Sequence, residues 1–345
     1  MGKTQKKQKK TLYVYLPKNN SDVTEVNHIN DSINMIKDLG NEPANILNPD
    51  AFVKYIKKRG SQTGFKVEIL DEPKLKSLKM NSLISVAQGS KHNAKMAIIT
   101  YKNSNTNPTV IVGKGITFDT GGNSIKGSRG MYEMKTDMLG AATTLGIVDL
   151  ITKLKLKKHV IGLLPIAENM PGMHATRPGD VVKSMSGKTI EIMNTDAEGR
   201  LIMADALTYA HRYKPNLIID IATLTGQQRS VSCGLFTTIM GNDDKIIDKF
   251  KQSGDKTDDR VWPMPLYPEF IEYTKSDIAD IKNAEYSCRS STILAGSFLS
   301  HFISNQKWIH LDIAGPSYIE KSIGYYKKGT TGAGLRVVLD FIRNN

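Results

Sequence analysis

Two carboxylates closely followed by an arginine form the most informative pattern in the chain. Asp196 and Glu198 are two residues apart in the run 194–201, and Arg200 follows two residues later. The run begins where a strand-like apolar segment, residues 189–193, stops. The small residues between these side chains allow the backbone to approach a ligand closely. This pattern predicts a ligand site at the end of a strand.

A second polar cluster lies upstream in glycine-rich sequence and comprises Lys114, Asp119, Lys126 and Asp137. Together the two clusters contain four acids and two lysines, which would be too costly to bury without counter-ions. Carboxylate oxygens are hard ligands that suit Mg, Mn or Zn. The sequence therefore predicts a pair of divalent cations, and with them a hydrolase.

Such a metal pair explains the number of acids. Two metals about 3.5–4 Å apart can share a water, lower its pKa and polarise a carbonyl. Asp119 and Glu198 fit as bridging ligands, with Asp137 and Asp196 each completing one metal. Histidine is absent from both clusters, and the seven histidines form no His-Glu-x-x-His pattern. This argues against a mononuclear zinc protease of that type.

The basic residues have separate expected roles. Burial and neighbouring positive charge lower the pKa of a lysine, so a neutral Lys114 could donate its lone pair to a metal. Lys126 could keep its charge and stabilise the oxyanion that forms when hydroxide attacks a carbonyl. Arg200, at the start of an expected helix, suits a small bound anion or the developing charge.

Several of these residues have structural alternatives. Asp137 could cap the N-terminus of the helix that it opens. Lys126 could be an ordinary surface lysine, and Met134 could pack in the core. Asp119 begins an Asp-Thr-Gly tripeptide, the catalytic sequence of aspartic proteases, but that class needs a second such tripeptide and an all-β pattern, and the chain has neither.

Composition indicates a soluble globular protein with ample length for a core. The chain has 345 residues, of which 39% are hydrophobic and 23% charged. Its two cysteines, Cys233 and Cys288, provide no disulfide framework and suit a reducing, cytoplasmic location. We find no secretory signal and no apolar run near the ~20 residues of a membrane span, so no membrane association is expected.

The net charge of +13 raises the question of nucleic acid. Many of the lysines crowd the first ten residues and the segment 153–158. A solvated lysine-rich surface with a flexible tail explains them, and anion or nucleic-acid binding remains the alternative.

Strand-like and helix-like segments alternate along most of the chain. We expect strands at 12–16, 65–70, 96–101, 110–118, 159–165, 217–223, 236–240 and 308–313. We expect helices from 28 to a break at 41–43 and at 52–58, 138–153, 200–211, 243–251, 291–303 and 333–342. The alternation is typical of an α/β fold with a mostly parallel central sheet flanked by helices on both faces. Residues 1–27 are expected to form a basic tail with a short strand and a linker, and residues 28–345 a single catalytic domain.

Polar residues follow three strand-like segments. Asp119 follows the segment 110–118, Asp196 follows 189–193, and residues 223–226 follow 217–221. In open α/β sheets, ligands bind beyond the carboxyl ends of the strands. We therefore expect three strand ends to meet at one site.

The chain closely resembles the leucyl (cytosol) aminopeptidase family of dinuclear metallopeptidases. The resemblance rests on segments 112–122, 131–142 and 194–201, with shorter matches at 168–171, 177–180 and 310–315. It extends from about residue 29 to the C-terminus and covers the family's catalytic domain. It implies a metal-dependent aminopeptidase that removes the N-terminal residue of peptides with a free N-terminus, using a hydroxide that bridges two divalent metals.

The resemblance also implies the metal ligands. Lys114, Asp119, Asp137 and Glu198 would hold one metal, and Asp119, Asp196 and Glu198 would hold the other. The metals are expected to be zinc or manganese, with cobalt or magnesium as alternatives, and the α-amine of the substrate would bind one of them.

The same resemblance implies two catalytic residues and a substrate pocket. Lys126 would stabilise the gem-diolate, and Arg200 would help to seat a bicarbonate that acts as general base. The substrate-binding residues would be Met134, Thr223, Leu224 and Gly226.

Some features depart from the family. Members carry a large N-terminal domain, whereas only about 28 residues precede the matched region, so that domain is expected to be missing or reduced to a tail. Members assemble as hexamers. For this chain the resemblance therefore implies a homo-oligomer, with the hexamer as the first expectation. Gln227, Gln228 and Leu294 replace usual pocket residues, and the glycine pair expected near 290–291 is absent, so a leucine preference is not assumed.

Two other functions remain open. A nucleic-acid-binding protein would show affinity that falls steeply with salt, and the lysine tail supports it weakly. A scaffold protein that retains the peptidase fold is a further alternative, against which the intact set of seven metal-binding and catalytic positions counts.

Overall fold

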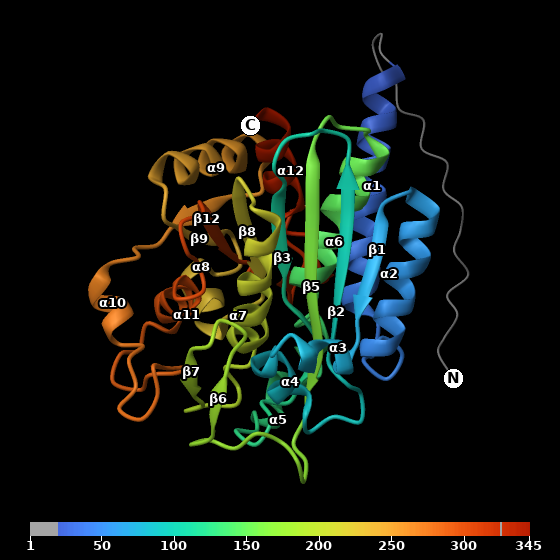
Figure 1. Ribbon diagram of the computed structural model, residues 1–345. Coiled ribbons are helices and arrows are strands. Elements are labelled where there is room, and N and C mark those ends of the chain that lie inside the picture. The colour runs from blue at the N-terminus through green and yellow to red at the C-terminus, as the bar shows by residue number, and fades with distance from the viewer. Residues whose placement is uncertain (1–19, 325) are drawn as a thin grey trace.

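A nine-stranded central sheet carries helices on both faces, which confirms the α/β class predicted from the sequence (Figure 1). This computed structural model describes residues 20–324 and 326–345. Five of the eight pairings between neighbouring strands are parallel, so the sheet is mostly parallel. The strand order is β1 (Lys66–Leu70), β2 (Lys95–Lys102), β5 (His159–Asn169), β3 (Thr109–Gly113), β8 (Leu217–Ala222), β12 (Trp308–Asp312), β9 (Thr237–Gly241) and β10 (Val261–Pro263), with β4 (Gly115–Asp119) paired to β5.

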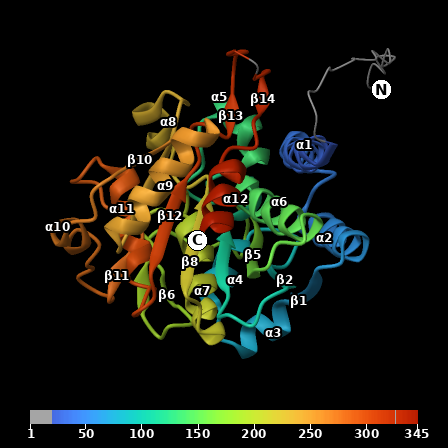
Figure 2. The same cartoon turned by 90° about the horizontal axis from the view of Figure 1, so that it is seen from above.

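The helices form two layers with a separate apolar core under each (Figure 2). One layer consists of α1 (Asn20–Asn41), α2 (Pro49–Thr63), α6 (Leu139–Lys153), α9 (Asp244–Thr257) and α12 (Leu335–Asn344). The other contains α3 (Glu72–Ser77), α4 (Asn81–Ala87), α7 (Gly199–Ala210) and α11 (Ser291–Ser300). Because both faces are covered, the inner strand β8 is buried at every residue, which explains its nearly continuous apolar sequence.

Shorter elements complete the molecule. They are α5 (Ser128–Met131), η1 (Tyr132–Thr136), η2 (His211–Tyr213), α8 (Gly226–Ser232) and α10 (Pro268–Glu272), the three-stranded sheet of β6 (Val181–Lys183), β7 (Thr189–Glu191) and β11 (Ile281–Lys282), and the pair of β13 (Tyr318–Ile319) and β14 (Gly329–Thr330). No helix within the described residues is long and apolar enough to cross a membrane.

The strand expected over 110–118 is in fact two strands interrupted at Lys114. β3 pairs with both β5 and β8, whereas β4 pairs with β5 alone. At the interruption, Lys114 N donates to Ile221 O (3.0 Å) and Ala141 N donates to Lys114 O (2.7 Å). The backbone at Lys114 is therefore held by β8 and α6. The mostly apolar sequence continues across the point where the pairing strands change. The break between β3 and β4 therefore has no local sign in the sequence.

The strand expected at 189–193 does not belong to the central sheet. β7 ends at Glu191 and pairs with β6 and β11 in the small sheet. The expectation that three strand ends of one sheet meet at the site is thus wrong for Asp196, which reaches the site from a neighbouring sheet. Short strands of both sheets have the same local pattern, so the sequence does not separate them.

The prediction of a linker is wrong for residues 20–27. Helix α1 begins at Asn20, so residues 20–27 are helical. Asn, Ser and Asp are common both in linkers and at helix N-termini, and composition does not distinguish the two. The strand expected at 12–16 lies outside the described residues.

Candidate active site

One cavity collects almost all of the predicted site residues. It has a volume of about 330 Å³ and lies beyond the ends of β4 and β8, beside η1 and the start of α7. Of the eleven predicted residues, ten line it: Lys114, Asp119, Lys126, Met134, Asp137, Asp196, Glu198, Thr223, Leu224 and Gly226. The segments that supply them lie far apart in sequence, so the convergence is a result of the fold.

Three carboxylates lie close enough to share a cation. Oxygens of Asp119, Asp196 and Glu198 all lie within 4.8 Å of one another. With Asp137, four carboxylates face two lysine ammonium groups, so the cluster carries two excess negative charges when all are ionised. Asp137 Oδ2 and Asp196 Oδ1 are buried and accept no hydrogen bond from the described part of the chain, although each lies beside a lysine. This donor set fits hard divalent cations.

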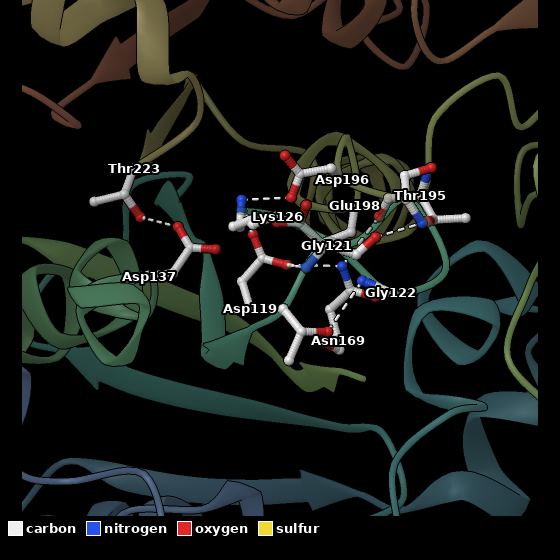
Figure 3. A network of polar contacts seen from close by, with 12 residues as sticks. Asp119, Gly121, Gly122, Lys126, Asp137, Asn169, Thr195, Asp196, Glu198 and Thr223 are labelled. Carbon is white, nitrogen blue, oxygen red and sulfur yellow. Dashed lines mark hydrogen bonds and ion pairs between the residues drawn. The ribbon is translucent and has the colours of Figure 1, made fainter. Parts of the chain in front are cut away.

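Lys126 lies between two of these acids (Figure 3). Its Nζ is 2.7 Å from Asp119 Oδ2 and also pairs with Asp196 Oδ1. Burial opposes the charge, but Asp119, Glu198 and Asp196 outweigh that effect and raise the pKa of Lys126. Its side chain is 22% exposed, so the alternative of an ordinary surface lysine is wrong.

Lys114 lies between the other two acids. Its Nζ is 2.8 Å from Asp137 Oδ1, 2.9 Å from Glu198 Oε1 and 3.0 Å from Thr223 O. Burial works against the ammonium group, but the charges of Asp137 and Glu198 are larger in sum and the pKa of Lys114 is raised. The sequence predicted a lowered pKa for Lys114, but beside these carboxylates its pKa is raised instead. Cations on the same carboxylates would compete with the ammonium group for them.

Asp137 lines the cavity and does not cap a helix. Helix α6 begins at Leu139 and no side chain caps it. Asp137 Oδ1 instead accepts hydrogen bonds from Lys114 Nζ and from Thr223 Oγ1 (2.8 Å). Asp137 directly follows the 3-10 turn η1, and its carboxylate reaches Thr223 just beyond the end of β8. Met134, in the same turn, is half-buried and lines the cavity, so it is not simply core packing.

The pKa values in the cluster reflect crowding of like charges. Burial, followed by the charges of Asp119 and Glu198, raises the pKa of Asp196 to about 7. Burial also raises the pKa of Asp119, with Glu198 adding to the effect. Burial opposes ionisation of Glu198 as well, but Lys114 and Lys126 outweigh it and lower its pKa. Carboxylates that resist ionisation next to one another are stabilised by a bound cation.

Arg200 lies beside the cavity and does not line it. It is 7% exposed, its Nη1 donates to Asn283 O (2.6 Å), and its guanidinium lies 5.9 Å from the centre of the Phe298 ring. Burial lowers the pKa of Arg200 to about 10. Its position in the first turn of α7, two residues after Glu198, keeps it close to the acidic cluster.

Two asparagines that position the site were not predicted. Asn169 Nδ2 donates to Asp119 Oδ1 (2.7 Å) and to Thr195 O (3.0 Å). Asn283 Nδ2 donates to Asn194 O (2.7 Å), while its Oδ1 accepts from Met193 N (2.8 Å). Asn169 ends β5, four residues beyond the predicted strand, so a longer strand prediction would have drawn attention to it. For Asn283 we find no local signal.

The comparisons with known proteins agree with this geometry. Residues 34–339 match the model of the cytosol aminopeptidase family, catalytic domain. The chain belongs to this family. It is 44% identical over 327 residues to a "Probable cytosol aminopeptidase" of Geotalea uraniireducens, covering 94% of this chain and 66% of that protein. It is also 44% identical to the "Cytosol aminopeptidase" of Pseudomonas aeruginosa, covering 92% of this chain and 64% of the relative.

Solved structures of a bottromycin maturation enzyme, BotP, have the same fold as this member of the family. BotP in complex with Mn superposes with a TM-score of 0.90 at 32% identity, covering 94% of this chain and 72% of that one. A second BotP structure gives a TM-score of 0.89. The chain spans about two thirds of the length of the curated relatives that it matches, between 63% and 66% for three of them.

Proposed function

We propose that this chain is a metal-dependent aminopeptidase that removes the N-terminal residue from peptides. One observation carries the proposal: Asp119, Asp137, Asp196 and Glu198 converge on a single cavity with excess negative charge. Membership of the cytosol aminopeptidase family supports the same function.

Five residues would hold two divalent cations. Lys114, Asp119, Asp137 and Glu198 would hold one, and Asp119, Asp196 and Glu198 the other. When bound, such a pair supplies a water of lowered pKa and a Lewis acid for the peptide carbonyl. Zinc or manganese is our first choice, with cobalt or magnesium as alternatives, and the Mn named with the relative BotP supports manganese.

Lys126 would stabilise negative charge during the reaction. Its Nζ reaches Asp119 and Asp196 from the cavity side and retains its proton because those acids raise its pKa. An ammonium group in this position can donate to the carbonyl oxygen as that oxygen gains charge. Because Asp119 and Asp196 already hold the ammonium group in place, Lys126 would need to move little to meet the carbonyl oxygen.

Arg200 would hold a small anion next to the cavity, with bicarbonate as the expected one. Within the described residues, Arg200 donates a hydrogen bond through Nη1 alone, to Asn283 O, and its buried guanidinium otherwise lies against Phe298. A planar guanidinium of this kind binds a planar oxyanion well. Bicarbonate there would act as general base.

The first side chain of the peptide would occupy the part of the cavity formed by Met134, Thr223, Leu224 and Gly226. We propose peptides with a free N-terminus as substrates, a homo-oligomer with the hexamer as first expectation, and a cytoplasmic location. The name of the relatives, cytosol aminopeptidase, supports the substrate class and the location.

The test is release of leucine, methionine and alanine from their p-nitroanilides. Metal-stripped protein should be inactive, and added Mn, Zn, Co or Mg should restore turnover. Glu198→Ala should remain inactive with every metal while keeping the circular dichroism spectrum of the parent. Failure of every metal to restore turnover in folded parent protein would overturn the proposal.

A further inference from the structure

A second cavity lies at the opposite edge of the central sheet. It has a volume of about 470 Å³. Its lining includes the first residues of β3, β5 and β8, which are Thr109, His159 and Leu217. Helices α9 and α12, which also contribute to it, lie at the upper edge of Figure 1. The peptidase site is at the carboxyl ends of these strands, so this cavity has no part in the proposed reaction.

Four lysines line this cavity, and no acidic side chain does. Lys307 pairs with Asp243 (3.0 Å). Lys249 Nζ contacts only a neutral group, Asn345 Oδ1 (2.6 Å). Within residues 20–324 and 326–345, no carboxylate lies within ion-pair distance of Lys157, Lys158 or Lys249. These three lysines therefore line one partly open pocket with no acidic side chain at ion-pair distance, and a bound anion would relieve their repulsion.

The floor of the cavity is apolar. Leu217, Phe341 and Ile342 are buried and Ile246 is half-buried, and all four contribute to the lining. Phe341 is itself fixed by stacking on Phe250 at a centroid distance of 4.0 Å. Cationic walls over an apolar floor match a ligand with both a multiply charged group and a flat apolar part. The volume lies within the range of small-molecule sites, about 300–1,000 Å³.

We propose that this cavity binds an organic phosphate of the nucleotide type. Its phosphates would contact Lys157, Lys158 and Lys249, and its ring would lie on Leu217 and Ile246. A single carboxylate would compensate only one of the three charges, whereas a di- or triphosphate compensates them all. Single-stranded nucleic acid is bound along open grooves lined with stacked aromatic rings. This pocket has one buried aromatic ring in its lining, Phe341, and no row of exposed aromatic rings, which favours a small molecule.

Calorimetric titration with ATP, in the presence of the bound metals, tests this site. The triple variant Lys157→Gln, Lys158→Gln, Lys249→Gln should bind ATP at least about tenfold more weakly than the parent, because each lost ion pair removes a fraction of a kcal/mol or more. The matched control is Lys54→Gln, Lys57→Gln, Lys58→Gln, which removes the same charge from exposed positions on α2. It should bind ATP as the parent does.

Binding of ATP at the metal site would be equal in the two triple variants, so a difference between them reports on this cavity alone. Adenosine, which lacks charge, and inorganic pyrophosphate, which lacks a ring, should each bind more weakly than ATP. Aminopeptidase turnover and the thermal midpoint should be unchanged in both variants. Equal ATP affinity of the two variants would overturn the proposal, as would no ATP binding by the parent or tighter binding of a short single-stranded oligonucleotide.

Discussion

Lys114 and Lys126 divide the acidic cluster between them. Lys114 lies between Asp137 and Glu198, and Lys126 lies between Asp119 and Asp196. The two lysines differ in access, because the side chain of Lys114 is 3% exposed and that of Lys126 is 22% exposed. Of the two, Lys126 is the more open to a substrate oxygen, which supports the different roles proposed for the two lysines.

Replacing Lys126 should therefore affect turnover more than metal binding. Lys126→Met should lower kcat by about 10²–10³ if its ammonium group stabilises the developing oxyanion. KM and the metal content should change little, and Lys126→Arg should recover part of kcat because it restores the charge. The check is steady-state kinetics together with metal analysis of the purified variants. A Lys126→Met protein that lost its metals but kept its kcat when metal was added back would contradict this role.

Gly199 allows Lys114 to reach the acids. A Cβ at Gly199 would lie 2.4 Å from Lys114 Cε and 2.7 Å from its Nζ, closer than real Cβ atoms approach. Gly199→Ala should therefore displace Lys114, reduce the amount of bound metal and cost about 1–3 kcal/mol of stability. The control is Gly127→Ala, whose added Cβ has no neighbour within 4 Å. Metal content and urea denaturation of both variants provide the measurement, and equal behaviour of the two would contradict the argument.

At the scale of elements, β8 and β12 are joined by a buried charged pair as well as by their parallel register. His310 Nδ1 lies 2.5 Å from Asp220 Oδ1, and Trp308 Nε1 donates to Asp220 Oδ2 (2.6 Å). Two residues beyond His310, Asp312 Oδ1 accepts from Leu224 N (3.0 Å). The strand pair thus fixes the loop that forms one wall of the active-site cavity.

This pair predicts a pH-dependent contribution to stability. Burial opposes protonation of His310, but Asp220 outweighs it and the pKa of His310 is raised. Its contribution should be fully present below the unfolded value of about 6.5 and should be lost as the pH rises through the folded pKa. His310→Leu should cost about 3–5 kcal/mol, because it leaves a buried charge unpaired.

The measurement is urea denaturation of the parent and the His310→Leu variant at about pH 6 and about pH 9. The difference between their free energies of unfolding should shrink as the pH rises. Trp308→Phe is the matched control. It removes a neutral donor to the same carboxylate, so its cost, about 1–3 kcal/mol, should not depend on pH over this interval. If the loss of unfolding free energy caused by His310→Leu stayed constant from acid to alkaline pH, that result would contradict the assigned protonation of His310.

At the scale of the whole molecule, the candidate active site joins parts of the fold that are otherwise separate. Asp119 ends β4, Asp137 directly follows η1, Asp196 comes after β7 of the small sheet and Glu198 precedes α7. Bound cations would tie these segments together. Because the same acids repel one another without cations, metal binding should stabilise the entire chain.

Removal of the metals should therefore lower the thermal midpoint. At a metal concentration 100 times its Kd, binding to the folded state adds about 2.7 kcal/mol. Calorimetry of stripped protein during titration with Mn provides the measurement. The midpoint of Glu198→Ala should respond far less, because Glu198 serves both proposed metals. A midpoint of the parent that was independent of metal would contradict a metal site in this cavity.

The sequence determined the types of residue in the site and the class of fold. Asp196, Glu198 and Arg200 stand within five residues of one another, so their shared position is a local property. The apolar runs of β8 and β12 are likewise local, because strands covered on both sides are apolar along their length. Residue types and local patterns were enough to name eleven candidates, of which ten line one cavity, although their meeting there is a result of the fold.

Only the tertiary structure decided how these residues meet. Asn169 contacts Asp119 across 50 residues of sequence, and Asn283 contacts Asn194 across 89. The break in the strand at Lys114 and the separate sheet of β7 depend on which strands become neighbours. Contacts of this kind arise from the packing of whole elements, and residue type and local periodicity carry no information about that packing. The sequence therefore predicted the residue types of the candidate site, whereas the fold fixed their geometry.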